Sequence, residues 1–170
     1  MLVAAFAALK AEGFPHGLVL FGPYKDDTPL AALCASLGVT GDVHQTAGVI
    51  AKHSDIVPVY GAADVFVHPS ENEGWSMTTT EALACGTAVI ATRRGGLGEV
   101  ADGYALMLDV PTRENLTAAL RQVLTDDRLR ADLQRRATLR GDQLRWDVLA
   151  RQTLDIVRAV GATAKGHRHA

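Results

Sequence analysis

Two glutamates with seven residues between them, Glu73 and Glu81, lie on either side of the point where a polar loop turns into a helix. Residues 70–77 are polar and glycine-containing, as loops usually are. The apolar run that follows stops at Gly86, a residue type common just after a helix C-terminus. We therefore expect a helix that begins near Thr78 and ends at Gly86.

The start of such a helix favours an anion, because its first backbone N–H groups have no intrahelical partner and carry a partial positive charge. A phosphate is expected on the amides around Trp75 to Thr79. A carboxylate beside it suits a neutral, hydroxyl-rich group, because carboxylates accept strong hydrogen bonds from sugar hydroxyls. A phosphate site next to a hydroxyl-binding acid indicates a nucleotide-sugar.

Each residue of this pattern also has a simpler interpretation. Residues 78–81 fit a capping box, in which Glu81 reaches back to the amide of an N-cap Thr78. Glu73 taken alone resembles a solvated loop acid, and Trp75 could cover the loop against the core. Only the combination favours a binding site.

Strands alternating with helices are expected to position this loop. Val65, Phe66 and Val67 form a short apolar run typical of a buried parallel strand, and Pro69 ends it. Strands are expected over residues 18–21, 43–46, 65–67, 88–91 and 104–108. The pattern predicts a Rossmann-like, three-layer α/β/α fold with a parallel sheet. Three C-terminal helices are expected to open at Thr112, at Asp126 or Asp127, and at Asp142.

Length and composition indicate a single domain. The chain has 170 residues, of which 48% are hydrophobic and 21% charged; we expect a domain over residues 1–160 and a disordered tail over residues 161–170. Cys34 and Cys85 fall on apolar helix faces and have no metal-ligand spacing, and no Asp-x-Asp pair occurs. We expect a cytoplasmic chain that needs no metal or other cofactor.

Basic residues concentrate in the C-terminal third, where arginines recur at Arg113, Arg121, Arg128, Arg130, Arg135, Arg136, Arg140, Arg145, Arg151 and Arg158. Arginines at helical spacing usually form a solvated face. Contact with anionic lipid headgroups, which would place the chain at a membrane surface, is the alternative. Nucleic acid is disfavoured as a partner, because stacking aromatic residues are not repeated among these arginines, where Trp146 stands alone.

The loop and its helix resemble a known family. The segments EGWS at residues 73–76 and EALACGTAVIA at residues 81–91 are similar to the donor-site motif of retaining glycosyltransferases with the GT-B fold, the "group 1" family (family four). The resemblance extends from Met1 to about Val160, and Trp146 and Asp147 resemble the start of the family's final helix.

The resemblance implies a role for each matching residue. Glu73 would contact the donor sugar near its reacting carbon, and Glu81 would bind the two ribose hydroxyls of the nucleotide. Backbone amides would face the sugar and diphosphate at Gly74, Trp75, Ser76, Met77 and Thr78, with Gly95 and Gly96 at the rim of the donor pocket. Ala47, Gly48 and Val49 would lie near the nucleobase. The expected reaction is transfer of a sugar from a nucleotide-diphospho-sugar to an acceptor hydroxyl, with retention at the anomeric carbon.

Several family features are not found in these 170 residues. The acceptor-binding half, and the basic loop that neutralises the diphosphate, would have to come from an N-terminal domain or a partner chain. Ser76 and Thr78 also depart mildly from the family's usual residues. In the family the first strand lies mid-sheet, so we expect a gap between the strand at residues 18–21 and the strand at residues 65–67.

The sequence is weighed against three alternatives to a glycosyltransferase. Residues 96–101 contain a G-x-G-x-x-A pattern, but no acid follows about twenty residues later, as nicotinamide-dinucleotide binding would require. A non-catalytic nucleotide-sugar-binding module that works with a partner chain is the second alternative. A fragment of a sugar-nucleotide epimerase, which shares the fold, is the third.

Overall fold

The computed structural model describes residues 1–22, 29–46 and 53–166 as strands alternating with helices. The strands are β1 (Leu18–Leu20), β2 (Val43–Gln45), β3 (Phe66–His68), β4 (Val89–Thr92) and β5 (Leu106–Leu108). The helices are α1 (Leu2–Ala11), α2 (Leu30–Ser36), α3 (His53–Ala62), α4 (Met77–Ala84), α5 (Gly96–Ala101), α6 (Arg113–Thr125), α7 (Asp127–Gln143) and α8 (Trp146–Gly166). All five expected strands are present, each within a few residues of its predicted bounds.

Strand β4 is the centre of the molecule, because all four of its residues are buried. Ala88, just before the strand, and Ile90 pack on the face covered by α1, α6 and the start of α7. Val89 and Ala91 pack on the opposite face, beneath α3, α4 and α5. Side chains alternate across a strand, so a strand covered by helices on both faces must be apolar throughout. The predicted three-layer α/β/α architecture is confirmed.

The parallel strands form two separate sheets. One has the order β3-β4-β5 and the other pairs β1 with β2, in register from Leu18 opposite Val43 to Leu20 opposite Gln45. Within the described residues β1 and β3 do not pair. The interruption that we expected between these two strands is therefore present.

Helix starts follow the predicted caps in the C-terminal part, with one exception. Thr112 caps α6 by accepting a hydrogen bond from the amide of Asn115, and Asp126 caps α7 by accepting one from the amide of Leu129. The start predicted at Asp142 is wrong, because α7 continues to Gln143 and the last helix begins at Trp146. Trp146 thus occupies the position that the resemblance implied.

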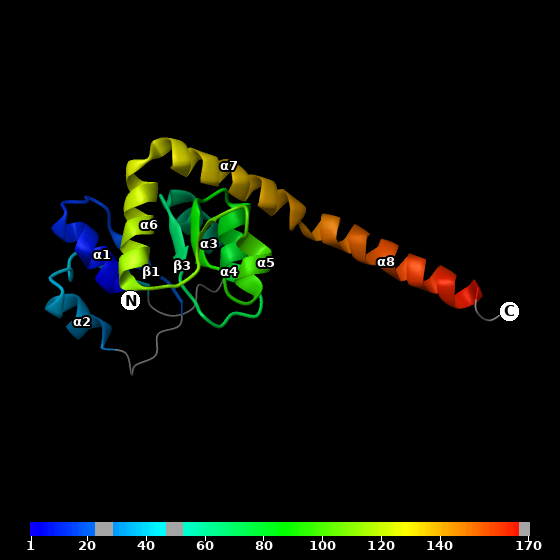
Figure 1. Cartoon of the computed structure of the whole chain (residues 1–170), viewed down its shortest axis with the longest axis horizontal. Helices are drawn as coiled ribbons and strands as arrows, with labels where there is room; N and C mark the ends of the chain where they lie inside the picture. The colour runs from blue at the N-terminus through cyan, green and yellow to red at the C-terminus, as the bar shows by residue number, and fades with distance from the viewer. Residues whose placement is uncertain (23–28, 47–52, 167–170) are drawn as a thin grey trace.

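Helix α8 projects away from the body of the molecule (Figure 1). It extends to Gly166, so residues 161–166 are helical and do not belong to a disordered tail as expected. Residues 151–160 are all exposed. Among the helices within the described ranges, none combines the length and the apolar character that crossing a bilayer requires.

Five arginines of α7 and α8 pair with acids of their own helices. Arg130 lies 2.6 Å from Asp127, and Arg151 lies 2.9 Å from Asp147. Asp132 also pairs with Arg135, at 2.7 Å, and with Arg136. These ion pairs offset much of the local positive charge, which favours a solvated face. Contact with a membrane surface stays a prediction.

Candidate functional site

The loop between β3 and α4 forms the centre of the site. β3 ends at His68, directly before Pro69, and α4 begins at Met77. Ser76 is the N-cap, and its hydroxyl accepts a hydrogen bond from the amide of Thr79 at 3.2 Å. The capping box proposed for Thr78 and Glu81 is therefore wrong, because the helix begins earlier and Glu81 lies within its second turn.

The Ser76 cap reduces the number of backbone amides that are available to a phosphate at this helix start. The amides of Met77 and Thr78 are in the first turn of α4 and have no intrahelical acceptor. The amide of Thr79, also in the first turn, already donates to the Ser76 hydroxyl. The side chains beside these amides face solvent: Trp75 is 44% exposed and Met77 is 51% exposed. An anion that reached this surface would meet two backbone donors at the positive end of α4.

The loop before α5 lies directly against the Glu73 loop. The amide of Gly96 donates to the carbonyl of Glu73 at 2.9 Å. A Cβ at Gly96 would lie 1.6 Å from the carbonyl oxygen of Gly74, and one at Gly95 would lie 2.3 Å from that of Glu73. Gly95 also has a φ of +51°, in the left-handed region. The structure thus brings Glu73, Gly74, Gly95 and Gly96 together, and only glycine fits at the last two positions.

The imidazole of His68, the last residue of β3, lies close to the Glu73 carboxylate. The imidazole Nε2 lies 3.5 Å from Oε2 of Glu73, and Nδ1 lies 2.9 Å from Oγ of Ser76 and 3.0 Å from Oγ1 of Thr79. Because Ser76 donates to Oγ1 of Thr79, the Thr79 hydroxyl is left to donate to Nδ1. The proton of the neutral ring then lies on Nε2 and points toward the Glu73 carboxylate.

Burial keeps this imidazole neutral. Desolvation lowers the pKa of His68 from its ordinary value of 6.5, and the nearby Glu73 carboxylate opposes part of that effect. His68 therefore contacts the cap of α4 through Nδ1 and lies near the Glu73 carboxylate through Nε2. The same imidazole ring thus contacts both the Ser76 cap and the Glu73 side chain.

The Glu81 carboxylate is held by a residue of α3, Tyr60. The Tyr60 hydroxyl donates to Oε2 of Glu81 at 2.9 Å. Tyr60 is only 1% exposed, and its ring packs edge-on against Phe21 and Phe66. Burial raises the pKa of Tyr60 far above its ordinary value, and the bond to Glu81 adds to that effect. The hydroxyl thus stays protonated and fixes one oxygen of the Glu81 carboxylate.

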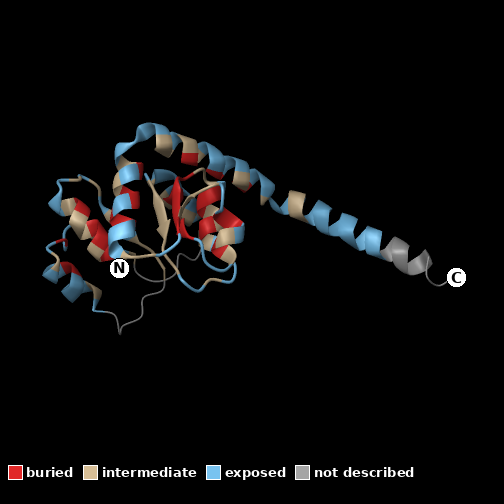
Figure 2. Cartoon of the chain, in the orientation of Figure 1, coloured by how far each residue is buried: buried red, intermediate tan, exposed pale blue. Residues whose placement is uncertain are grey.

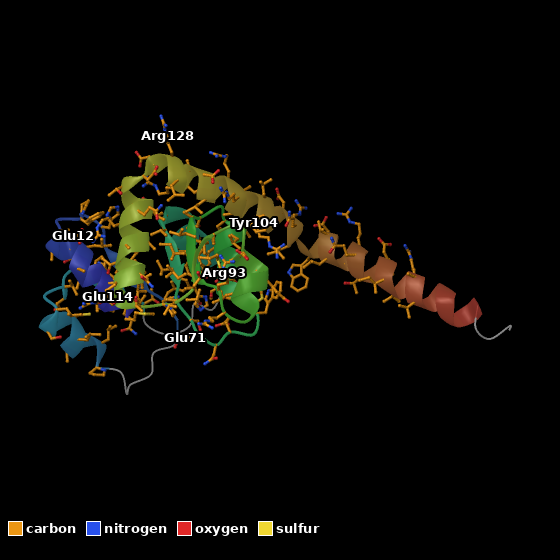
Figure 3. All side chains as sticks on the ribbon, viewed as in Figure 1. Glu12, Glu71, Arg93, Tyr104, Glu114 and Arg128 are labelled. Atoms are coloured by element: carbon orange, nitrogen blue, oxygen red, sulfur yellow. The ribbon has the colours of Figure 1, made fainter. Side chains whose placement is uncertain are left out.

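Arg93, which is labelled in Figure 3 and follows β4, is paired with two acids. Its guanidinium pairs with Asp102 and lies 3.0 Å from Asp109, and these contacts raise its pKa. Because its charge is already paired with these acids, Arg93 does not supply the positive charge that a bound diphosphate would need. In the ranges 1–22, 29–46 and 53–166, no three His, Cys, Asp or Glu side chains converge as a metal site would require.

The predicted site residues fall into two groups. Glu73, Gly74, Trp75, Ser76, Met77, Thr78, Glu81, Gly95 and Gly96 all lie in or beside the two adjoining loops and the first turns of α4. Ala47, Gly48 and Val49, predicted near the nucleobase, lie outside the described residues.

Two residues of the site, His68 and Tyr60, were not predicted. His68 was placed just beyond its strand, although its position directly before Pro69 at a strand end was a usable signal. Tyr60 is 21 residues from Glu81 in the chain, and no local pattern indicates that contact.

Comparisons with known proteins agree with this architecture. The family model described as "Glycosyl transferases group 1" matches residues 1–140. A D-inositol 3-phosphate glycosyltransferase from Saccharomonospora viridis is 40% identical over 114 residues, which are 66% of this chain and 26% of that protein. The chain spans between 23% and 38% of the length of the first relatives that it matches.

Solved structures share the fold. Sucrose-phosphate synthase from Thermosynechococcus elongatus superposes with a TM-score of 0.76 and 25% identity, over 95% of this chain and 42% of that one. HepE from Anabaena, solved in complex with UDP, superposes with a TM-score of 0.76 and 19% identity, over 94% of this chain and 45% of that one. With a family model that covers most of its length, this chain belongs to the group 1 family of glycosyl transferases.

Proposed function

We propose that this chain is the donor-binding half of a retaining glycosyltransferase, and that its ligand is a nucleotide-diphospho-sugar. One observation carries the proposal: two carboxylates are held by different partners on either side of two amides that lack intrahelical acceptors. His68 approaches Glu73 and Tyr60 holds Glu81, and α4 begins between these two acids. The order of these groups along the chain suits a ligand that has a sugar, a diphosphate and a second sugar ring in series.

Each group has a role that follows from its chemistry. Glu81, with one oxygen fixed by Tyr60, would accept hydrogen bonds from the ribose hydroxyls. The amides of Met77 and Thr78 would stabilise the negative charge that develops on the leaving diphosphate. Glu73 would accept hydrogen bonds from hydroxyls of the donor sugar and hold its reacting carbon in place. The relatives named as glycosyltransferases, and the UDP complex of HepE, support this choice of ligand.

The acceptor hydroxyl would be presented by another part of the enzyme. We propose an N-terminal acceptor-binding domain or a partner chain, which would also supply the basic groups that the diphosphate needs. Two observations support this. The chain spans well under half of the relatives that it matches, and Arg93, beside the site, is already engaged with acids.

A ligand screen tests the proposal. The purified chain is heated with UDP-, GDP- and ADP-sugars, because a ligand that binds only the folded state raises its melting temperature. One nucleotide class should raise it in wild type and in the control Glu114→Gln, which changes an exposed acid on α6, but not in Glu81→Gln. The chain alone should transfer no sugar to an acceptor. Equal stabilisation of wild type and Glu81→Gln, or measurable transfer, would contradict the proposal.

A further inference from the structure

Arg94 is one of two arginines that have no side-chain partner among the described residues. Every other arginine whose side chain the structure describes bonds to an acid or to a carbonyl oxygen. The second exception is Arg128, which is exposed at the start of α7 and lies far from Glu71 in Figure 3. Arg94 is exposed as well, so the two differ in the part of the molecule that surrounds them.

Arg94 belongs to a segment that runs beside the Glu73 loop. The Thr92 hydroxyl donates to the carbonyl of Ser70. Gly95 lies so close to Glu73 that a Cβ there would be 2.3 Å from the carbonyl oxygen of Glu73. The same number of residues separates the two members of each pair, so the segments stay parallel beyond the ends of β3 and β4.

This register places Arg94 opposite Asn72, the residue just before Glu73. Strand β4 is buried along its whole length, whereas the segments that follow β3 and β4 come to the surface (Figure 2). The backbone carbonyl of Asn72 accepts a 3.3 Å hydrogen bond from the Ser70 hydroxyl. Within the described ranges the side-chain amide of Asn72, like the guanidinium of Arg94, has no partner. Two groups of free N–H donors therefore extend from neighbouring backbone positions.

A free guanidinium at this position suits an oxyanion. Its planar fork of N–H donors matches two oxygens of a phosphate or a carboxylate, and such charge-assisted pairs are stronger than neutral hydrogen bonds. The acids nearby do not occupy it: Glu73 lies beside His68, and Glu99 of α5 forms no ion pair with Arg94 among the described residues. The guanidinium is thus available to an anion from outside the chain.

Glu73 lies between Arg94 and the start of α4 in the order of the loop. Residue 72 precedes this acid, and the free amides of Met77 and Thr78 follow it. With a diphosphate on those amides and a sugar at Glu73, as proposed above, Arg94 lies on the carbohydrate side of the site. An oxyanion at Arg94 then belongs to a sugar or to the acceptor, and not to the diphosphate.

We propose that Arg94 is a specificity residue that binds an oxyanion, a phosphate or a carboxylate, on the carbohydrate side of the donor site. The oxyanion is carried by the transferred sugar or by the acceptor, and Arg94 selects such a substrate over its neutral counterpart. The assignment of this side to carbohydrate rests on the proposed function. The oxyanion site itself rests on the free donors of Arg94 and Asn72.

The side-chain Nε–H resonances of Arg94 and Arg128 test the proposal in a single sample. The folded chain is titrated with inorganic phosphate and with glucose 6-phosphate in the absence of nucleotide. Glucose, and potassium chloride at matched ionic strength, serve as control ligands. Arg128 is the matched reference, because it is also exposed and unpaired among the described residues but lies away from the site.

The Arg94 resonance should shift saturably with both phosphates, at concentrations at least about tenfold below those that shift Arg128. Glucose and chloride should leave it unchanged. Arg94→Gln should weaken the binding of glucose 6-phosphate at least about tenfold, followed on the amides of Asn72 and Glu73. Arg94→Lys should retain part of the affinity, because the charge stays while the fork is lost. Arg128→Gln should have no effect.

A second pair of ligands shows which substrate carries the oxyanion. If it is the transferred sugar, Arg94→Gln should weaken the binding of a nucleotide-uronate such as UDP-glucuronate, but not that of the matching nucleotide-glucose. If it is the acceptor, both donors should bind Arg94→Gln as they bind wild type, and only the affinity for glucose 6-phosphate should fall.

Equal responses of Arg94 and Arg128, or no saturable response of Arg94 to the phosphates or the uronate, would overturn the proposal. A loss of affinity for the plain nucleoside diphosphate in Arg94→Gln would overturn it too, because the guanidinium would then bind the diphosphate. These results are separate from the proposed function. A response to glucose 6-phosphate in a chain that binds no nucleotide-sugar would refute that function and leave the oxyanion site in place.

Discussion

The contact between Gly96 and the Glu73 loop provides the sharpest test of how the site is built. In Gly96→Ala the new methyl carbon would lie 1.6 Å from the carbonyl oxygen of Gly74, 2.6 Å from its carbonyl carbon and 3.2 Å from Cα of Trp75. All three are backbone atoms, so no side-chain rotation relieves the clash. One loop must move by well over 1 Å, and the 2.9 Å bond from the Gly96 amide to Glu73 breaks with it.

The expected magnitude follows from that displacement. Overpacking of this kind costs about 1–3 kcal/mol of folding free energy, and a misplacement of about 1 Å at a site can cost about a hundredfold in activity. We therefore expect Gly96→Ala to lower the melting temperature by several degrees and to weaken donor binding at least tenfold.

Gly98→Ala is the matched control, because it lies on the same helix with no atom within 4 Å of the new methyl group. Replacing a helical glycine by alanine should stabilise this variant by about 0.5–1 kcal/mol. Differential scanning calorimetry and titration calorimetry with the nucleotide-sugar measure both effects. If Gly96→Ala and Gly98→Ala behaved alike in stability and affinity, the two loops would not be in contact as described.

Three further predictions follow from the hydrogen bonds of the site. Ser76→Ala removes the N-cap of α4 and should cost about 0.5–2 kcal/mol in thermal or urea unfolding, whereas Ser36→Ala, at an exposed helix end, should cost little; equal costs would mean that Ser76 is not the cap. Tyr60→Phe removes the donor to Glu81 and should weaken nucleotide binding about tenfold by titration calorimetry, and an unchanged affinity would exclude Tyr60 from positioning that acid. Burial lowers the pKa of His68, so the unfolded chain takes up a proton at higher pH than the folded chain, and stability should fall as pH drops below about 6.5; urea unfolding from pH 7 to pH 5 should show a shallower fall in His68→Gln, and the same fall in both chains would refute this assignment.

Much of the fold could be predicted because local patterns and burial agree. The apolar run at residues 88–91 and the stop at Pro69 placed β4 and the end of β3 within a residue. Strands this apolar must be covered on both faces, so the three layers follow from the pattern alone. Helix starts were less certain where two residues compete for the cap. Ser76 is the cap rather than Thr78, because its hydroxyl accepts the hydrogen bond from the amide of Thr79.

The contacts within the site were harder to predict than its members. The loop residues around Glu73 were identified by their types and by the family resemblance, and Gly95 and Gly96 by the resemblance alone. These glycines touch the backbone of the Glu73 loop because β4 places α5 beside that loop. No local sequence pattern predicts this tertiary contact. The contacts from His68 and Tyr60 likewise arise from tertiary packing between elements distant in the chain.

The central claim is that a nucleotide-diphospho-sugar binds across Glu73, the start of α4 and Glu81. Amide chemical shifts recorded while the nucleotide-sugar is added test it most directly, because they report on each residue of the folded chain. The account predicts that the largest changes fall on residues 73–79 and 95–97, with the amides of Met77 and Thr78 foremost, and that Glu81→Gln abolishes them. Saturable binding whose shift changes lie elsewhere, for example on α6 or α8, and persist in Glu81→Gln would contradict it.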